Sequence, residues 1–196
     1  MTDSGAAGAP ARTRGGKRER LASAAAEVFH RQGVERTTLS DIAAVADVPL
    51  GNVYYYFKTK DHLVEAALGA HLSQLHAVTE ELDRLPDPAD RLKALIDGWV
   101  DQRHTAARYG CPFGTLATEL DKRDDGLDRT AGTVMQALID WVQDQITQMS
   151  RTDAHELAVE FVAAYQGMSM LTNILRDPEV MAAQGRRLIA WVDTLT

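Results

Sequence analysis

Four consecutive aromatic residues close the segment VPLGNVYYYF, residues 48–57. Residues that follow one another on a helix point roughly 100° apart, so Tyr54, Tyr55, Tyr56 and Phe57 cannot all face one core. We expect Val53, Tyr56 and Phe57 to pack inward and the first two tyrosines to stand outside. An exposed tyrosine brings a hydroxyl to a phosphate oxygen at modest entropic cost, so the pattern indicates contact with a nucleic-acid backbone.

Two small residues precede the tyrosines and extend the same chemistry. Gly51 has no side chain, which lets the backbone come close to a partner, and the amide of Asn52 can bond a base edge or a phosphate. The charge distribution agrees. The net charge is −7, yet residues 1–60 carry 9 Lys and Arg against 6 Asp and Glu. This is the footprint of a local phosphate-binding surface on an acidic body, although a solvated basic tail over residues 12–20 is an alternative.

The elements that must hold these residues are helices. Thr38 is a good N-cap with Asp41 three residues on, and Ile42 and Val45 are then expected to point inward from the helix that follows. A tight turn leads into the tyrosine segment, which makes the pair a helix-turn-helix. Longer helices are expected from Thr59, over 88–108, and in the three segments after residue 123, so the fold class is all-α. The first 16 residues, rich in Gly, Ala and Pro, are expected to be a flexible arm.

The stretch TTLSDIAAVADVPLGNVYYYFKTKDHL, residues 37–63, resembles the helix-turn-helix signature of the tetracycline-repressor (TetR) family of bacterial regulators. The resemblance implies an N-terminal three-helix DNA-binding domain over residues 17–63 and a larger helical ligand-binding and dimerisation domain over 64–196. It also implies a homodimer that binds a pseudo-palindromic double-stranded operator and is released from it by a small molecule, most simply as a repressor. Carried over by position, the residues implied to meet DNA are Thr38, Leu50, Gly51, Asn52, Tyr54, Tyr55 and Lys60.

The larger domain is expected to hold an apolar or amphipathic effector, because the resemblance implies a cavity among its middle helices. Met and aromatic side chains line such cavities, although they also fill ordinary cores. The candidates are Trp99, Phe113, Met135, Leu138, Trp141, Tyr165 and Met168. The last two helices are expected to form the dimer interface, with a charged residue at Val192 giving monomers. Their apolar residues at helical spacing include Val159, Val162, Leu188, Ile189, Val192 and Leu195.

Cys111 is the single cysteine, and it leaves two alternatives open. A thiol at the start of a helix is favoured as a thiolate, which indicates a redox or electrophile sensor of the same fold. A free cysteine is more often a small buried hydrophobe, which indicates a packing role. A helical binding protein that does not bind DNA is a further alternative.

Catalysis has little support in the sequence. There is no Gly-rich phosphate loop and no H-E-x-x-H pattern, and the six histidines are scattered. We therefore expect no catalytic residues, no metal site and no cofactor. No apolar run is long enough to cross a bilayer and the N-terminus lacks the apolar centre of a signal peptide, which favours a cytoplasmic bacterial protein that joins the nucleoid when bound to DNA.

Overall fold

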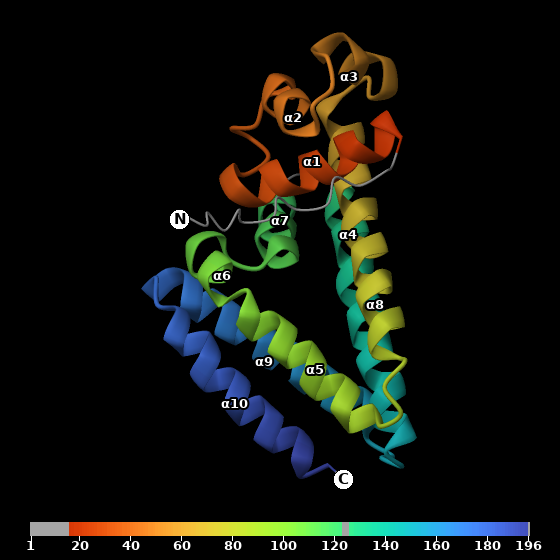
Figure 1. Ribbon diagram of the computed structural model, residues 1–196, viewed down its shortest axis with the longest axis vertical. Helices are drawn as coiled ribbons and strands as arrows, with labels where there is room; N and C mark the ends of the chain where they lie inside the picture. Colours follow the sequence, from red (N-terminus) through yellow and green to blue (C-terminus); the bar gives the residue numbers. More distant parts are fainter. Residues whose placement is uncertain (1–15, 123–125, 196) are drawn as a thin grey trace, which may run out of the picture.

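The computed structural model describes residues 16–122 and 126–195, which form ten helices and no strand. The all-α expectation is therefore confirmed. Figure 1 shows the N-terminal helices at one end of the long axis, a group of later helices at the other, and two long helices, α4 (Lys60–Leu82) and α8 (Leu127–Gln148), running between them. No helix within the described residues is at once long and apolar enough to cross a membrane. The arm expected over residues 1–16 lies, except for Gly16, outside the described residues.

The N-terminal cluster consists of α1 (Lys17–Gln32), α2 (Leu39–Ala46) and α3 (Leu50–Tyr56). Its helices pack on the first half of α4 (Lys60–Leu82), and α1 crosses that helix (Figure 1). The side chains that fill the space between these four helices are buried and almost all apolar. They include Leu21, Ala25, Phe29, Ile42, Val53, Phe57, Leu63 and Val64.

Local chemistry fixes the ends of these helices. Thr38 caps α2, because its Oγ1 accepts a hydrogen bond from the Asp41 amide at 3.2 Å while the Asp41 carboxylate accepts one from the Thr38 amide at 2.8 Å. These hydrogen bonds from Thr38 hold the pKa of Asp41 below its ordinary value. The turn into α3 passes through Asp47 in the left-handed region, at φ 52°. Gly33, at φ 81°, ends α1 with its amide bonded to the Phe29 carbonyl at 2.8 Å.

The larger part contains α5 (Pro88–Asp101), α6 (Arg103–Tyr109), α7 (Pro112–Leu120) and α8 (Leu127–Gln148). The single helix expected over residues 88–108 is wrong, since the chain breaks at Gln102. There the backbone reaches φ −89° and ψ 8° and the amide bonds the Trp99 carbonyl three residues back, at 3.1 Å. The break lets α6 turn onto its neighbours.

The turn of α6 is secured by α9 (Ala154–Leu175), the helix against which α6 packs. Asn173 donates its amide Nδ2 to the carbonyls of Ala106 and Ala107, both at 3.3 Å. The guanidinium of Arg176, one residue past α9, donates to the Ala107 and Arg108 carbonyls at 3.1 and 2.6 Å. Arg176 thus satisfies the carbonyls of Ala107 and Arg108, which lie in the last turn of α6 and have no amide of that helix left to bond.

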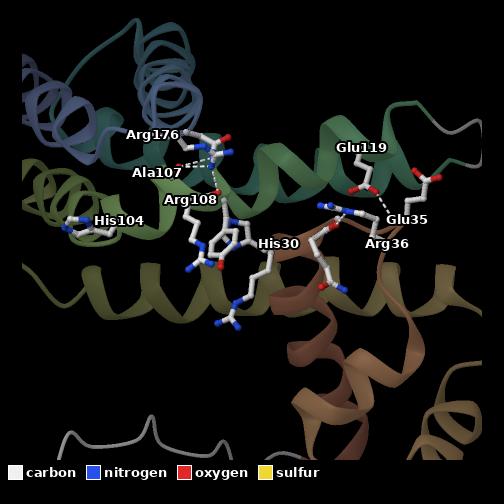
Figure 2. A pocket seen from close by; sticks show the side chains of 13 residues that line it. His30, Glu35, Arg36, His104, Ala107, Arg108, Glu119 and Arg176 are labelled. Carbon is white, nitrogen blue, oxygen red and sulfur yellow. Dashed lines mark hydrogen bonds between the residues drawn. The ribbon is translucent and has the colours of Figure 1, made fainter.

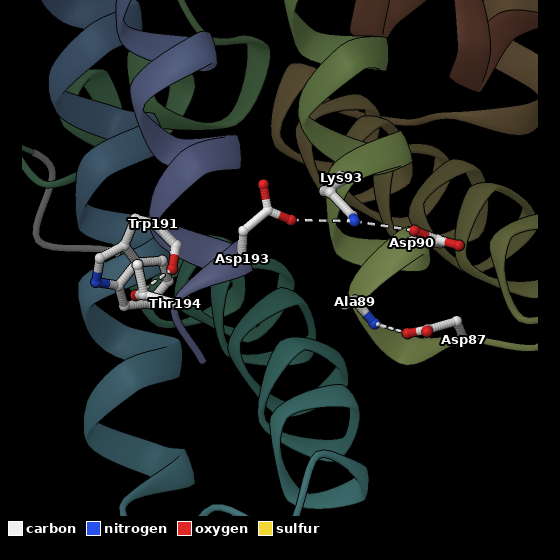
Figure 3. A network of polar contacts seen from close by, with 7 residues as sticks. All are labelled: Asp87, Ala89, Asp90, Lys93, Trp191, Asp193 and Thr194. Carbon is white, nitrogen blue, oxygen red and sulfur yellow. Dashed lines mark hydrogen bonds and ion pairs between the residues drawn. The ribbon is translucent and has the colours of Figure 1, made fainter. Parts of the chain in front are cut away.

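The last helix, α10 (Pro178–Asp193), packs between α5 and α9 over a second apolar core. Figure 3 shows how its end is fastened to the start of α5: the Lys93 ammonium lies 3.0 Å from the carboxylate of Asp90 and 3.2 Å from that of Asp193. Both partners raise the pKa of Lys93. The group is exposed, so it contributes little energy and mainly marks the register of the two helices.

The last two helices correct part of the expected dimer surface. Val162, Leu188, Val192 and Leu195 are buried inside this one chain, so the expectation that a charge at Val192 would produce monomers is wrong. Such a charge would disrupt the core instead. Val159 is exposed, and it begins an apolar stripe along α9 that is completed by Ala163, Gly167, Met170, Leu171, Ile174 and Leu175.

Candidate nucleic-acid interface and buried cavity

The outer face of α3 presents the two tyrosines that sequence reasoning singled out. The exposed fractions are 53% for Tyr54 and 74% for Tyr55, whereas Val53 between them and the core is completely buried. The ring of Tyr55 meets the ring of Tyr56 edge to face, with centroids 4.9 Å apart. That contact limits the rotamers of Tyr55 and holds its hydroxyl out into solvent.

The start of α3 is open to a partner as well. Leu50 is 40% exposed, Asn52 is half-buried, and a Cβ on Gly51 would meet no heavy atom within 4 Å. Among the described residues no neighbouring group demands a glycine at residue 51, and the space beside it is open. A leucine at the first position offers an apolar contact to a base methyl and no hydrogen bond.

Thr38, which precedes α2, and Lys60, which begins α4, have internal roles too. Besides capping α2, the Thr38 hydroxyl donates to the Asp41 carboxylate at 2.7 Å. The Lys60 ammonium donates to the Glu35 carbonyl at 3.0 Å and thereby ties the start of α4 to the loop after α1. An ammonium has three donors, so two remain for a phosphate.

Val45 was expected to point inward with Ile42, and that expectation is wrong. Ile42 is completely buried, but 46% of Val45 is exposed. On the short α2 the buried face passes through Ala43 and Ala46, because α2 contacts α1 and α3 along that side.

A cavity of about 730 Å³ lies beneath α1, where it is bounded by α1, α4, α5, α6, α7 and α9. Three of the residues proposed to line a ligand cavity are on its wall: Trp99, Phe113 and Tyr165. The indole of Trp99 and the ring of Tyr165 stack with centroids 3.9 Å apart and 18° between planes. Burial raises the pKa of Tyr165, so its phenol stays neutral at physiological pH.

The other four proposed ligand residues are not among those that line this cavity. Leu138 and Met168 are buried in the second core, and Met135 is half-buried against it. Trp141 donates its indole Nε1 to the Asp83 carboxylate at 3.1 Å, at the end of α4 distant from α1. These residues obey the commoner rule that Met and aromatic side chains fill cores.

Sequence reasoning missed the cavity's most informative residue, His71. Its ring meets the Phe113 ring edge to face at 4.8 Å, and burial lowers its pKa from 6.5 to about 4. Its Nε2 is buried and has no hydrogen-bonding partner among the described residues. A signal was available, because Ala67, Leu68 and Leu75 place residue 71 on the apolar face of a helix.

Cys111 is buried and serves as the N-cap of α7. Its Sγ accepts a hydrogen bond from the Gly114 amide at 3.3 Å, and the Tyr165 hydroxyl and the Gln166 amide donate to it at 3.5 and 3.6 Å. Only 5% of the residue is exposed, which favours the packing role over contact with an oxidant in solution. Within the described residues, no three His, Cys, Asp or Glu side chains are grouped to hold a metal ion.

A second, polar cleft of about 950 Å³ lies where the end of α1 meets α6, α7 and α9 (Figure 2). On one side of it the Glu119 carboxylate accepts hydrogen bonds from the amides of Val34 and Glu35, each at 2.9 Å. On the other side His30 bonds the Gly110 carbonyl at 2.9 Å. The Glu119 contacts thus join the end of α7 to the loop after α1, and the His30 contact joins α1 to the turn that leads into α7.

These features define a class of all-helical proteins with an N-terminal helix-turn-helix. Here α3, the second helix of that motif, has the exposed face that DNA would meet, and a cavity lies beneath α1. Residues 21–67 match the model of the tetR family of bacterial regulatory proteins, and residues 88–188 match that of a tetracyclin repressor-like C-terminal domain. The chain belongs to the TetR family and is a helix-turn-helix transcriptional regulator.

Known proteins agree with this assignment. An uncharacterized HTH-type transcriptional regulator of Mycobacterium tuberculosis is 29% identical over 175 residues, covering 83% of this chain and 87% of the relative. A TetR transcriptional regulator from Legionella pneumophila superimposes with a TM-score of 0.78 at 15% identity, over 89% of this chain and 96% of the other. A TetR-family regulator from Streptomyces coelicolor gives a TM-score of 0.76 at 22% identity, over 91% and 93%. At sequence identities this low, the two solved structures support the fold and do not indicate a shared function.

Proposed function

We propose that the protein is a repressor that binds a pseudo-palindromic operator as a homodimer and leaves it when an apolar or amphipathic molecule enters the cavity beneath α1. It acts in the bacterial cytoplasm and joins the nucleoid when bound to DNA. The observation that carries the proposal is the outer face of α3, where Tyr54 and Tyr55 are exposed beside Gly51, a glycine that no contact with the described residues requires.

The DNA part of the proposal places α3 in a major groove and α2 across the backbone. Tyr54, Tyr55, Thr38 and Lys60 then contact phosphates, while Asn52 and Leu50 meet base edges. Phosphate contacts set the register of the protein and base contacts set its sequence preference, so the two groups of residues are separable by mutation.

The dimer part rests on the stripe along α9 that runs from Val159 to Leu175. Ile174 is 65% exposed, Met170 63% and Leu175 60%, a contiguous apolar surface of the kind that a second copy covers. Ala163 and Gly167 on the same face allow two helices to approach closely, and a Cβ on Gly167 would meet nothing within 4 Å. A second copy related by two-fold symmetry would pair this stripe with itself.

The effector part rests on the cavity and the polar cleft together. An occupant would press on Phe113 at the start of α7, and the Glu119 and His30 contacts would pass a shift of α7 to α1. The switch is then a shift in population toward a form whose two α3 helices no longer fit successive grooves. The burial of Cys111 is the reason for placing the signal in the cavity instead of the thiol.

Selection of random duplexes by the purified protein tests the DNA part. We expect an enriched pseudo-palindrome with half-sites about one helical turn apart, or slightly more. A double variant Tyr54→Ala, Tyr55→Ala should enrich no sequence, while Lys122→Ala, distant from α3, serves as the matched control. Enrichment of the same sequence by the double variant would overturn the assignment of α3.

Sedimentation tests the dimer part separately. Ile174→Arg places a charge in the stripe and should yield a folded monomer with much weaker operator binding. Leu85→Arg is the control, because Leu85 is 36% exposed and lies in the loop between α4 and α5. A wild-type protein that sediments as a monomer at micromolar concentration contradicts the proposed interface.

A further inference from the structure

The cavity beneath α1 changes in character along its length. Its α4 wall extends from Ala70 to Leu82, which is about 18 Å at 1.5 Å per residue. The end far from α1 is apolar, with Leu75, Val78 and Leu82 opposite Leu95 of α5. The end beneath α1 is polar, and the residues that line it there include Ser23, Glu27, His30, His71, Gln102 and Thr105.

The polar end contains one buried atom without a partner. The exposed fraction of His71 is 7%, and its Nε2 has no hydrogen-bonding partner within the described part of the chain. A buried polar atom left unpaired is costly, so an occupant that bonds it gains more than the same bond would bring in water. In a neutral imidazole one nitrogen donates a hydrogen bond and the other accepts one. A hydroxyl group can both donate and accept, so it can bond Nε2 in either tautomer.

The cavity offers nothing to balance a charged occupant. Among the described residues that line it there is no lysine or arginine. The one carboxylate, that of Glu27, is paired with Arg31 at 2.7 Å. Burial lowers the pKa of both His30 and His71, so both rings are uncharged at neutral pH. Several lining residues, Glu27, Gln74 and Val78 among them, are exposed, so the cavity is partly open to solvent. An ion that enters it loses part of its hydration and gains no counter-ion, which disfavours carboxylates and amines relative to uncharged ligands.

We infer that the effector is an uncharged, elongated and largely apolar molecule with a hydroxyl group at one end, and that this hydroxyl bonds Nε2 of His71 beneath α1 after a rotation of the ring, because the atom is covered in this structure. The inference rests on the proposed function, since it names the chemistry of the molecule that the cavity takes. The apolar body lies along α4 against Leu75 and Val78, and the Trp99 ring offers it an aromatic wall.

The orientation also specifies where regulation begins. Four lining residues, Ser23, Ala26, Glu27 and His30, belong to α1. The hydroxyl end of the occupant therefore touches the DNA-binding part itself, and the effect on α3 does not have to travel the whole length of α4. An occupant that lacks the hydroxyl fills the apolar end and leaves the polar end unchanged.

Three matched probes test the inference by equilibrium dialysis with the full chain at pH 7.5: biphenyl, 4-phenylphenol and biphenyl-4-carboxylate. We expect 4-phenylphenol to bind roughly three- to tenfold more tightly than biphenyl, the gain of one hydrogen bond. Plain partition into an apolar space would give the opposite order, because the hydroxyl makes the phenol less hydrophobic. The carboxylate should bind more weakly than either. Equal binding of phenol and biphenyl, tighter binding of the carboxylate, or no binding of the phenol at its solubility limit overturns the inference.

Variants of His71 test whether this residue forms the hydrogen bond to the ligand hydroxyl. His71→Phe should reduce the affinity for 4-phenylphenol to that for biphenyl and leave biphenyl binding unchanged. His71→Gln, which keeps a hydrogen-bonding group, should retain most of the preference, and His76→Phe on the exposed side of α4 is the control. A loss of both affinities in the phenylalanine variant, with the preference also absent in the glutamine variant, contradicts the role of His71.

The outcome is independent of DNA. Dialysis measures the ligand without an operator, so failure of the hydroxyl preference leaves the selection experiment and the sedimentation experiment standing. Conversely, a protein that shows the preference but selects no duplex refutes the proposed repressor while the chemistry of the cavity holds.

Discussion

His30 of α1 donates its Nε2–H to the carbonyl oxygen of Gly110, which lies eighty residues later in the chain, at 2.9 Å. A carbonyl only accepts, so Nε2 is the protonated nitrogen of this ring. Gly110 has φ 79°, and a Cβ there would come within 2.8 Å of the Thr115 side chain. Only glycine therefore fits at the position whose carbonyl His30 bonds.

Loss of this hydrogen bond should weaken the joint between the two parts of the protein. His30→Leu leaves the Gly110 carbonyl unpaired, and we expect the free energy of unfolding to fall by about 1–3 kcal/mol. Urea denaturation followed by circular dichroism measures it. His104→Leu, a change at an exposed residue of the same cleft, is the control. Identical midpoints for the two variants would show that the bond contributes nothing.

Removal of a single tyrosine hydroxyl should weaken DNA binding when the tyrosine is an exposed one and should have no effect at half-buried Tyr56. Tyr55→Phe should weaken binding to specific and random duplexes alike, by roughly two- to tenfold, because a phosphate contact carries no sequence information. Tyr56→Phe should leave affinity unchanged. Fluorescence anisotropy at several salt concentrations provides the measurement, and a loss confined to the specific duplex would assign Tyr55 to a base edge.

The stability of the protein should decline on the acid side because of His71. Its pKa is about 4 in the folded chain and 6.5 in the unfolded one, so the unfolded state binds the proton more readily between these values. Stability from this group is fully present above pH 6.5 and is lost as the pH falls through 4, by roughly 2–3 kcal/mol. Thermal melts from pH 7.5 to 4 should show a shallower decline for His71→Gln. Parallel curves would indicate that His71 is solvated.

The Cys111 thiol should react slowly in the folded protein. Its burial and its three hydrogen-bond donors keep it from a thiol reagent until the start of α7 opens. Ellman's reagent should modify it far more slowly in buffer than in 6 M guanidinium chloride, and the reagent should leave operator binding unchanged in the wild type as in Cys111→Ser. Rapid modification in buffer accompanied by release of DNA would revive the redox-sensor alternative.

The sequence predicted the DNA-binding end well because its signals are local. A cap at Thr38, a turn before Pro49 and a run of four aromatic residues depend on neighbours within a few positions, so the helix bounds and the exposure of Tyr54 and Tyr55 followed. The error at Val45 has the opposite origin. On a helix of two turns, the buried face is chosen by the helices packed against it, and periodicity alone does not distinguish residue 45 from residue 46.

The cavity could be predicted only in part, because its walls come from six helices distant in sequence. Trp99, Phe113 and Tyr165 lie on it, whereas Leu138 and Met168, of the same chemical kind, fill the core. The break at Gln102 was equally hidden: the donors that hold α6 in its turn, Asn173 and Arg176, come some seventy residues later. No local pattern carries that information.

The position of α1 has a consequence for protein engineering. Biosensors are often assembled by grafting the DNA-reading segment of one regulator onto the effector-sensing body of another, with the joint placed just before the long connecting helix. In this protein such a graft would change the operator preference and would also replace Ser23, Ala26, Glu27 and His30. These residues form the α1 wall of the cavity beneath α1. A chimera that retains its own α1 and exchanges only α2 and α3 should keep its effector specificity while binding a new operator.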